Sequence, residues 1–90
     1  MKSAIMNLVM RVDDNVYFSK SELYRIVCGN IKKYRIQRGI TQQVLSERIE
    51  MSHEYLRQLE SQKGQKDFTF YSLYKIAFVL DVPIDDFLKP

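Results

Sequence analysis

The stretch TQQVLSERIEMSHEYLRQLE, residues 41–60, decides the fold of this chain. It holds two short amphipathic segments that are separated by only a few residues. In the first segment Leu45 is followed by the small residue Ser46, which lets a second helix cross closely. The second segment carries Leu56 and Leu59 on its inward side. We predict two helices that cross steeply over a tight turn and that need further helices to cover them.

The turn between the two segments contains Glu50. A turn of this kind needs a residue in the left-handed backbone region, which glycine adopts most easily. A side chain in that region costs roughly 1–2 kcal/mol. We expect Glu50 to carry this cost, because no glycine is present in the turn.

Helix start signals occur five times along the chain. In four of them an apolar residue precedes a hydroxyl residue that can cap free N–H groups, and a second apolar residue follows to close a hydrophobic staple. The four are Phe18-Ser19 with Leu23, Ile40-Thr41 with Leu45, Met51-Ser52 with Leu56, and Phe68-Thr69 with Leu73. Glu22 completes a capping box in the first. The fifth, Val82-Pro83 with Phe87, has Pro in place of the hydroxyl residue, and we predict five helices.

Apolar residues recur between these starts with a period of about 3.6. The first helix is expected to run from about Lys20 to Arg38 and to stop at Gly39. Cys28 lies beside its apolar stripe and is interpreted as a small buried hydrophobe. The positions predicted to form the core are Leu23, Ile26, Val27, Ile31, Tyr34, Val44, Leu45, Ile49, Leu56, Leu59, Leu73, Ile76, Ala77, Leu80, Ile84, Phe87 and Leu88. The sequence therefore predicts an all-α domain over residues 18–90.

Residues 1–17 do not follow this pattern and are treated as a separate N-terminal arm. Apolar residues alternate with others over residues 8–12, and the turn-prone Asp-Asp-Asn follows, which predicts a β-hairpin. A short helix over residues 3–10 is the alternative. The apolar arm is a candidate for self-association, or for packing back on its own domain.

The bulk composition fits one globular domain of 90 residues, with 46% hydrophobic and 28% charged residues. The net charge of +3 permits nucleic acid or an acidic protein as a partner without requiring either. The run SAIMNLVM near the N-terminus is too short for a membrane span and lacks a signal-peptide cleavage pattern. We expect a cytoplasmic protein without membrane association.

Catalytic chemistry is not indicated. The single cysteine, Cys28, and the single histidine, His53, form neither a metal-ligand spacing nor a nucleophile pattern, and no Gly-rich phosphate loop occurs. The pair Asp85-Asp86 is more simply a favourable interaction with a helix N-terminus. We expect no enzyme, no catalytic residue, no metal site and no cofactor.

A wider set of residues matches one known family. The matching positions are Gly39-Ile40-Thr41-Gln42, Ser46, Ser52, Leu59-Glu60 and Ile76-Ala77-Leu80. With these residues the chain resembles the helix-turn-helix of the lambda-repressor-like family, also called Cro/cI or XRE type, from about Tyr24 to Leu88. The resemblance implies a five-helix lambda-repressor-like DNA-binding domain. Its implied function is sequence-specific transcription regulation, as a repressor that binds double-stranded DNA as a homodimer.

By this resemblance the helix at residues 53–60 is the recognition helix that enters the major groove. The residues that it directs at base edges are His53, Glu54, Tyr55, Arg57 and Gln58. Arg57 suits guanine and Gln58 suits adenine. Glu54 either accepts a bond from cytosine or favours the N-terminus of its own helix. Tyr55 either contacts DNA or lies flat over Leu59 and the following loop.

Phosphate contacts are predicted for Gln42, Lys63, Lys66 and Arg38. For Arg35 and Arg38, at the end of the first helix, a solvated surface role is equally expected, because cations are favourable at a helix C-terminus. The family often pairs through its last helix, so Phe87 and Leu88 are candidates for the dimer contact. The N-terminal arm competes for the same role.

A second hypothesis is an antitoxin-like or adaptor protein whose main role is to bind a protein partner, such as a toxin. The apolar N-terminal arm and the acidic residues Glu50 and Glu54 near the expected DNA surface motivate this alternative.

Overall fold

The computed structural model describes residues 17–61 and 66–90. Within these ranges the chain forms four α-helices and one 3₁₀ helix, and no strand. The elements are α1 (Lys20–Gln37), α2 (Gln42–Arg48), α3 (His53–Ser61), α4 (Phe70–Leu80) and η2 (Ile84–Leu88). The predicted all-α class is confirmed for this part of the chain. The predicted hairpin belongs to residues 1–17, of which the structure describes only Tyr17.

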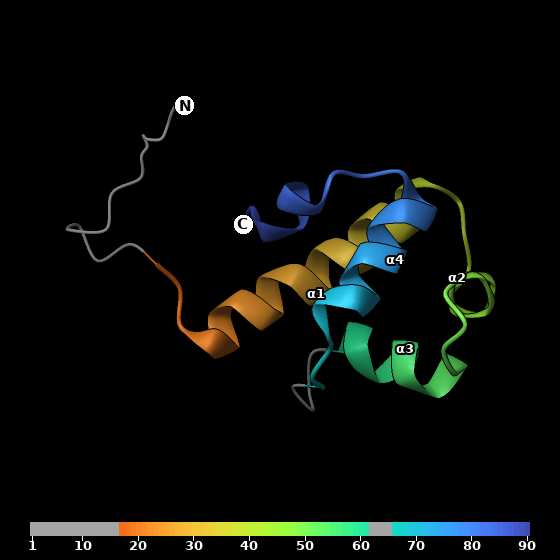
Figure 1. Ribbon diagram of the computed structural model, residues 1–90, viewed down its shortest axis with the longest axis horizontal. Coiled ribbons are helices and arrows are strands. Elements are labelled where there is room, and N and C mark those ends of the chain that lie inside the picture. Colours follow the sequence, from red (N-terminus) through yellow and green to blue (C-terminus); the bar gives the residue numbers. More distant parts are fainter. Residues whose placement is uncertain (1–16, 62–65) are drawn as a thin grey trace.

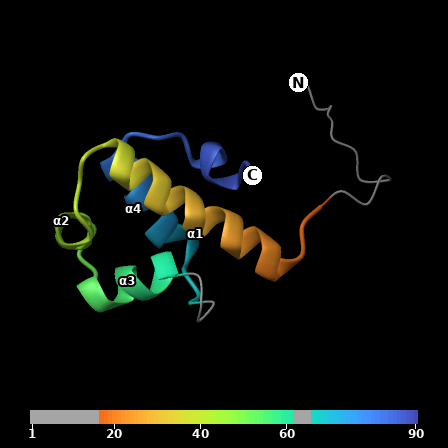
Figure 2. The ribbon, with the colours of Figure 1, turned by 180° about the vertical axis from the view of Figure 1, so that it is seen from behind.

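The long helix α1 lies at the centre of the helix packing (Figure 1). Helices α3 and α4 and the 3₁₀ helix η2 all pack against α1, while α2 packs against α3 and α4. Seen from behind, α1 crosses in front of α4, and α3 lies beside the lower edge of the domain (Figure 2). This arrangement supplies the cover that the short pair α2 and α3 needs.

The helices begin where hydroxyl side chains cap them. Ser19 accepts a hydrogen bond from the backbone N–H of Glu22, and the Glu22 carboxylate accepts one from the N–H of Ser19. The other hydroxyl caps are Thr41 on the N–H of Val44, Ser52 on that of Tyr55, and Thr69 on that of Ser72. All four hydroxyl start signals and the capping box are confirmed. Each cap satisfies an N–H group that has no partner within its helix.

The fifth predicted helix is not an α-helix. Residues Ile84–Leu88 form a 3₁₀ helix, and Pro83 before it makes no side-chain hydrogen bond to its first turn. Proline has no side-chain oxygen to offer, and five residues are too few to complete a stable α-helical nucleus. The tighter 3₁₀ geometry is usual for such short segments. Of the five predicted helices, four are therefore α-helices and the last is a 3₁₀ helix.

The core gathers residues from every described helix. Its buried apolar members are Val27, Cys28, Ile31, Leu45, Ile49, Leu56, Leu59, Leu73, Ile76, Ala77, Leu80, Val82 and Phe87. Burial of Cys28 is confirmed. Phe87 is fully buried and meets Tyr34 edge to face, so it cannot serve as an exposed dimer contact. Leu88 was predicted in the core but is exposed, because the 3₁₀ turn directs it outward.

Helix α1 ends through Gly39, whose φ of +72° turns the chain toward α2. A glycine reaches this left-handed conformation without steric cost. Helix α1 ends at Gln37 with Arg38 as its C-cap, one residue before the predicted end, and the chain turns at Gly39 as predicted.

Glu50 has a positive φ of 60°, as predicted for the turn between α2 and α3. Its backbone N–H bonds to the carbonyl of Glu47, and its side chain is exposed. Glu50→Gly should therefore stabilise the domain by about 0.5–1 kcal/mol, since relief of left-handed strain exceeds the added entropy of the unfolded chain. Urea denaturation followed by circular dichroism measures this change. A lower unfolding midpoint for the variant would show that interactions of the Glu50 side chain stabilise the domain by more than its left-handed backbone destabilises it.

A search of the described residues finds no helix that is both long and apolar enough to cross a membrane.

Candidate nucleic-acid interface

The pair α2 and α3 is held at its crossing by buried side chains and by the turn backbone. Leu45 and Ser46 of α2 are buried where α3 crosses them. The backbone N–H of Met51 donates to the carbonyl of Ser46 at 3.0 Å, which closes the turn. Leu56 and Leu59 bury the inward side of α3. One face of α3 is thereby fixed to the body, and the opposite face is presented to solvent.

The outward face of α3 carries four of the five predicted base-reading residues. His53, Glu54 and Arg57 are exposed, and Gln58 is partly exposed. All lie within the nine residues of one helix, so their positions relative to one another are set by helical geometry. This face is a short polar surface of the width that enters a major groove.

Glu54 is bonded to both of the residues that best suit base recognition. The guanidinium of Arg57 donates to the Glu54 carboxylate at 2.6 and 3.1 Å, and the Gln58 amide donates to it at 3.0 Å. The hydrogen bond from Arg57 holds the pKa of Glu54 below its usual range. Glu54 therefore stays ionised and holds both side chains along the helix surface in the free protein.

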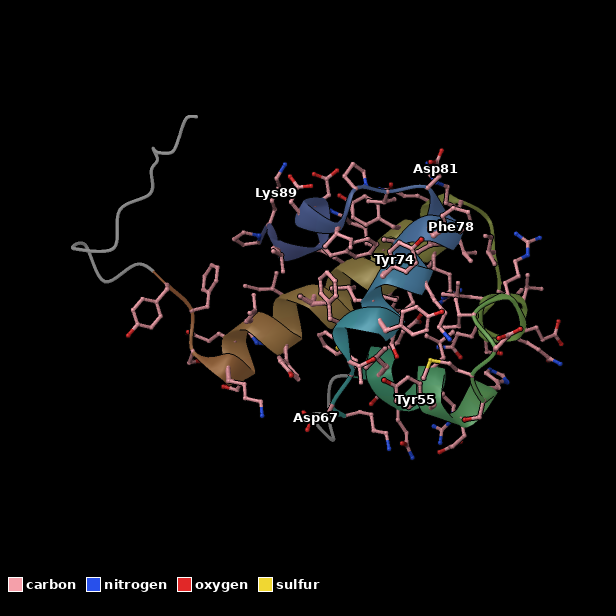
Figure 3. The ribbon with its side chains drawn as sticks, in the orientation of Figure 1. Tyr55, Asp67, Tyr74, Phe78, Asp81 and Lys89 are labelled. Carbon is pink, nitrogen blue, oxygen red and sulfur yellow. The ribbon has the colours of Figure 1, made fainter. Side chains whose placement is uncertain are left out.

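Tyr55 lies away from this polar face. Its side chain is partly buried, and its hydroxyl donates to the carbonyl of Asp67 at 3.0 Å, beyond the end of α3 (Figure 3). The Lys66 ammonium lies 5.6 Å from the centre of its ring. Of the two roles considered for Tyr55, this geometry matches the one in which the ring covers the loop after α3.

Gln42, the predicted phosphate ligand, is held at the start of α2 by two contacts. Its amide nitrogen donates to the Glu60 carboxylate at 3.0 Å. Its amide oxygen lies 3.3 Å from the Nε2 atom of His53, at the start of α3. The Gln42 side chain thus links both ends of α3, and its position is set before any ligand arrives.

Glu60 is the centre of a buried ion pair that sequence reasoning missed. Two guanidinium nitrogens of Arg35 donate to its carboxylate at 2.7 and 2.9 Å, and a third donates to the carbonyl of Ile40 at 2.8 Å. The Arg35 and Glu60 side chains are 11% and 2% exposed. Both expectations for Arg35, a phosphate contact or a solvated cation, were therefore wrong. A signal was available, because Arg35 and Glu60 lie four residues after the buried Ile31 and Leu56, on the inward faces of their helices.

Arg38 is engaged by the end of α4. Its guanidinium donates to the carbonyl of Leu80 at 2.6 Å and to that of Asp81 at 3.0 Å. These carbonyls close α4, where Asp81 has a left-handed φ of 57°. A phosphate contact by Arg38 stays a prediction that would compete with this cap.

Of the two loop lysines that were predicted to contact phosphates, the structure describes only Lys66. Lys63 lies outside the described residues. Lys66 is exposed beside Tyr55, so its ammonium is accessible at the C-terminal end of α3.

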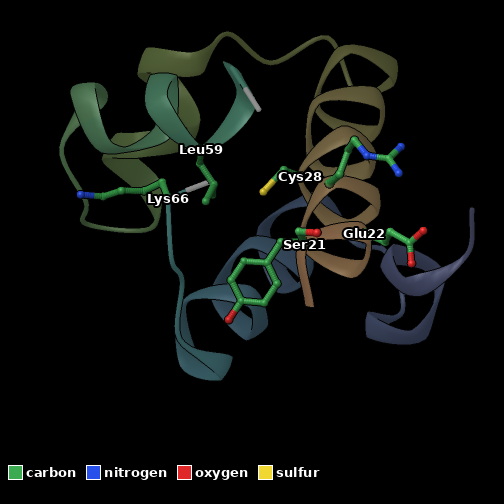
Figure 4. Close-up of a pocket in the computed structure, with 7 residues that line it drawn as sticks. Ser21, Glu22, Cys28, Leu59 and Lys66 are labelled. Carbon is green, nitrogen blue, oxygen red and sulfur yellow. The ribbon is translucent and has the colours of Figure 1, made fainter. Parts of the chain in front are cut away.

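Cys28 opens on a small cavity of about 160 Å³ between α1, the end of α3 and Lys66. Cys28 and Leu59 point toward one another there (Figure 4). Burial raises the pKa of the Cys28 thiol to about 11, which keeps it protonated and weakly nucleophilic. In the described ranges no three residues of the metal-ligating types His, Cys, Asp and Glu come together.

A family model for helix-turn-helix domains of the XRE, Cro/cI-like type matches residues 31–87, well over half of the chain. The chain belongs to this helix-turn-helix family. Its members are DNA-binding regulatory domains and are typically not enzymes. The match includes all of α2, α3 and α4, so the crossed pair α2 and α3 lies within the matched helix-turn-helix region. No curated protein matches the chain.

Proposed function

We propose that this helix-turn-helix protein is a transcriptional repressor that binds a two-fold-symmetric DNA site as a homodimer. The observation that carries the proposal is the outward face of α3, where His53, Glu54, Arg57 and Gln58 are accessible while Leu56 and Leu59 anchor the helix. We also propose that the protein acts in the cytoplasm.

Gln42 is proposed to anchor the DNA backbone. One N–H of its amide is used by Glu60, which leaves the second N–H free to donate to a phosphate oxygen. Lys66, Lys63 and Arg38 are proposed to contact flanking phosphates. Such contacts position α3 in the groove without reading sequence.

Glu54 is proposed to shape base recognition in addition to Arg57 and Gln58. Arg57 can pair with guanine only after it turns away from the Glu54 carboxylate, which then becomes free to accept a bond from a cytosine amino group. DNA sites that offer a guanine to Arg57 and a cytosine to Glu54 are therefore favoured over sites that offer only the guanine. Tyr55 is proposed to support this end of α3 through the loop, with no direct base contact.

Selection of bound sequences from a random duplex library at near-physiological salt tests the proposal. A palindromic site should be enriched. Gln58→Ala should then lose about 1–3 kcal/mol of discrimination at one base position in each half-site, because a bidentate pair with adenine is removed. The matched control is Gln37→Ala, which removes an exposed amide from α1, outside the α2 and α3 pair.

Two outcomes would contradict the proposal. The first is that no sequence is enriched and only weak, strongly salt-dependent binding is seen, which is the behaviour of non-specific binding. The second is that Gln58→Ala and Gln37→Ala have equal effects at every position of the enriched site.

A further inference from the structure

The outer face of α4 carries aromatic side chains that the domain does not use. Phe70, Tyr71, Tyr74 and Phe78, here called the α4 aromatic face, are 48–76% exposed. Helical periodicity places them within one arc of about 100°. Tyr71 stacks on Tyr74 at 6.1 Å between ring centres, and Tyr74 meets Phe78 at 6.4 Å. So many large exposed aromatics on one 11-residue helix mark an interaction surface.

We propose that the α4 aromatic face binds a second copy of this chain, with the two α4 helices antiparallel about a two-fold axis beside Tyr74. The inference rests on the proposed function, because a two-fold DNA site calls for two copies of the recognition helix. The α4 aromatic face is the surface that joins the two copies.

The face is complementary to itself. Tyr74 lies four residues from both Phe70 and Phe78, so an axis beside Tyr74 brings Phe70 of one copy to Phe78 of the other. A shallow hollow lies at the C-terminal end of the face, and it is lined by Tyr74, Ala77, Phe78, Asp81, Val82, Pro83 and Ile84. Antiparallel pairing places the protruding rings at the N-terminal end of the partner's α4 against this hollow. The same symmetry fills the second hollow.

Asp81 caps the C-terminal end of α4, and its side chain borders the hollow. In the antiparallel pair this carboxylate lies near the N-terminal end of the partner's α4, where the helix dipole attracts it and the exposed Asp67 of the other copy repels it. Lys75, the only cation on α4, lies 5.0 Å from the Tyr71 ring centre, at the edge of the face. Like charges are thereby kept from the centre of the contact.

The area suits a weak, reversible dimer. An aromatic side chain carries about 150–250 Å² of surface, so the four exposed rings offer about 400–650 Å² on each copy. With all of that surface covered, two copies bury at most about 800–1,300 Å², near the roughly 1,200 Å² below which interfaces are usually transient. Tyr74 and Phe78 lie on α4, apart from Tyr55 on α3 (Figure 3). The proposed contact uses no residue of the outward face of α3.

Sedimentation of the full chain over a series of concentrations tests the inference. The parent should dimerise without DNA, and Phe78→Glu should weaken the dimer by about 100-fold, because a carboxylate would be buried among rings. The matched control is Leu88→Glu, which puts the same charge on an exposed leucine of η2 and should leave the dimer unchanged. A parent that stays monomeric would overturn the inference. Dissociation by Leu88→Glu but not by Phe78→Glu would also overturn it.

A cross-link gives a second readout that does not depend on disrupting the interface. In a Cys28→Ala background, Tyr74→Cys should form a disulfide between two copies under mild oxidation, whereas Leu88→Cys should not. The reverse pattern contradicts the inference. DNA selection on the same preparations separates the two proposals. A dimer joined at Tyr74 that enriches no sequence defeats the proposed function alone, and a dimer that enriches a palindrome but does not cross-link at Tyr74 defeats the α4 contact alone.

Discussion

Glu60→Ala is expected to lower the free energy of unfolding by about 3–5 kcal/mol, the range found when one partner of a buried ion pair is removed. The variant leaves the Arg35 guanidinium buried with only the Ile40 carbonyl as an acceptor. It also removes the acceptor that holds the Gln42 amide. Urea denaturation followed by circular dichroism measures the loss.

The control for this prediction is Glu54→Ala, which breaks an ion pair of the same chemistry on the surface of α3. Both members of that pair are more than half exposed, so the unfolding midpoint should barely move. A second control replaces both members of the buried pair, as Arg35→Met with Glu60→Leu. Much of the stability should return, because apolar residues can fill the site without an unpaired charge. A loss for Glu60→Ala no greater than that for Glu54→Ala would contradict the assignment.

The double variant also separates stability from DNA recognition. Its fold should be retained, yet Gln42 would lack the carboxylate that positions its amide at the start of α2. We therefore expect weaker binding to all DNA sequences alike, as for loss of a phosphate contact. Unchanged DNA affinity in a folded double variant would show that Glu60 does not position Gln42 for this purpose.

Asn30→Leu is expected to lower the free energy of unfolding by about 2–4 kcal/mol, since two carbonyl groups would each lose a buried donor. The Asn30 amide donates to the carbonyls of Phe87 and Lys89, both at 2.8 Å, and its side chain is buried in α1. Leucine is the better helix former, so local propensity alone would predict a gain. Urea denaturation measures the total loss of stability, and hydrogen exchange shows which part of the domain loses it.

The amides of η2 should exchange faster in Asn30→Leu, by a larger factor than those of α3, because Asn30 ties the C-terminal segment to α1. Asn30→Asp is the shape-matched control, in which an acceptor replaces the donor and faces the same two carbonyls. It should be at least as destabilising as the leucine variant. A stable Asn30→Asp protein would show that packing, and not the two hydrogen bonds, makes Asn30 important.

Features that depend on near neighbours in the chain were predicted well, and features that depend on distant residues were not. The four hydroxyl caps and the left-handed Glu50 were predicted correctly, because each depends on neighbours within one turn. The last predicted helix is a 3₁₀ helix, because Pro83 offers no side-chain acceptor to its first turn and the segment is only five residues long. Tyr55 could not be placed in advance, because its partner, the Asp67 carbonyl, lies on a loop whose path depends on α4.

The sequence by itself determined the helix starts, most of the core and the two short helices of residues 41–60 that cross over a tight turn. These follow from caps and apolar spacing, which act over a few residues. Only the tertiary structure decided that Arg35 pairs with Glu60, 25 residues away, and that Asn30 bonds to Phe87, 57 residues away. It also decided that the aromatic side of α4 stays uncovered. The physical reason is that a polar group shows its need for a partner through burial, but which partner it meets depends on how the helices dock.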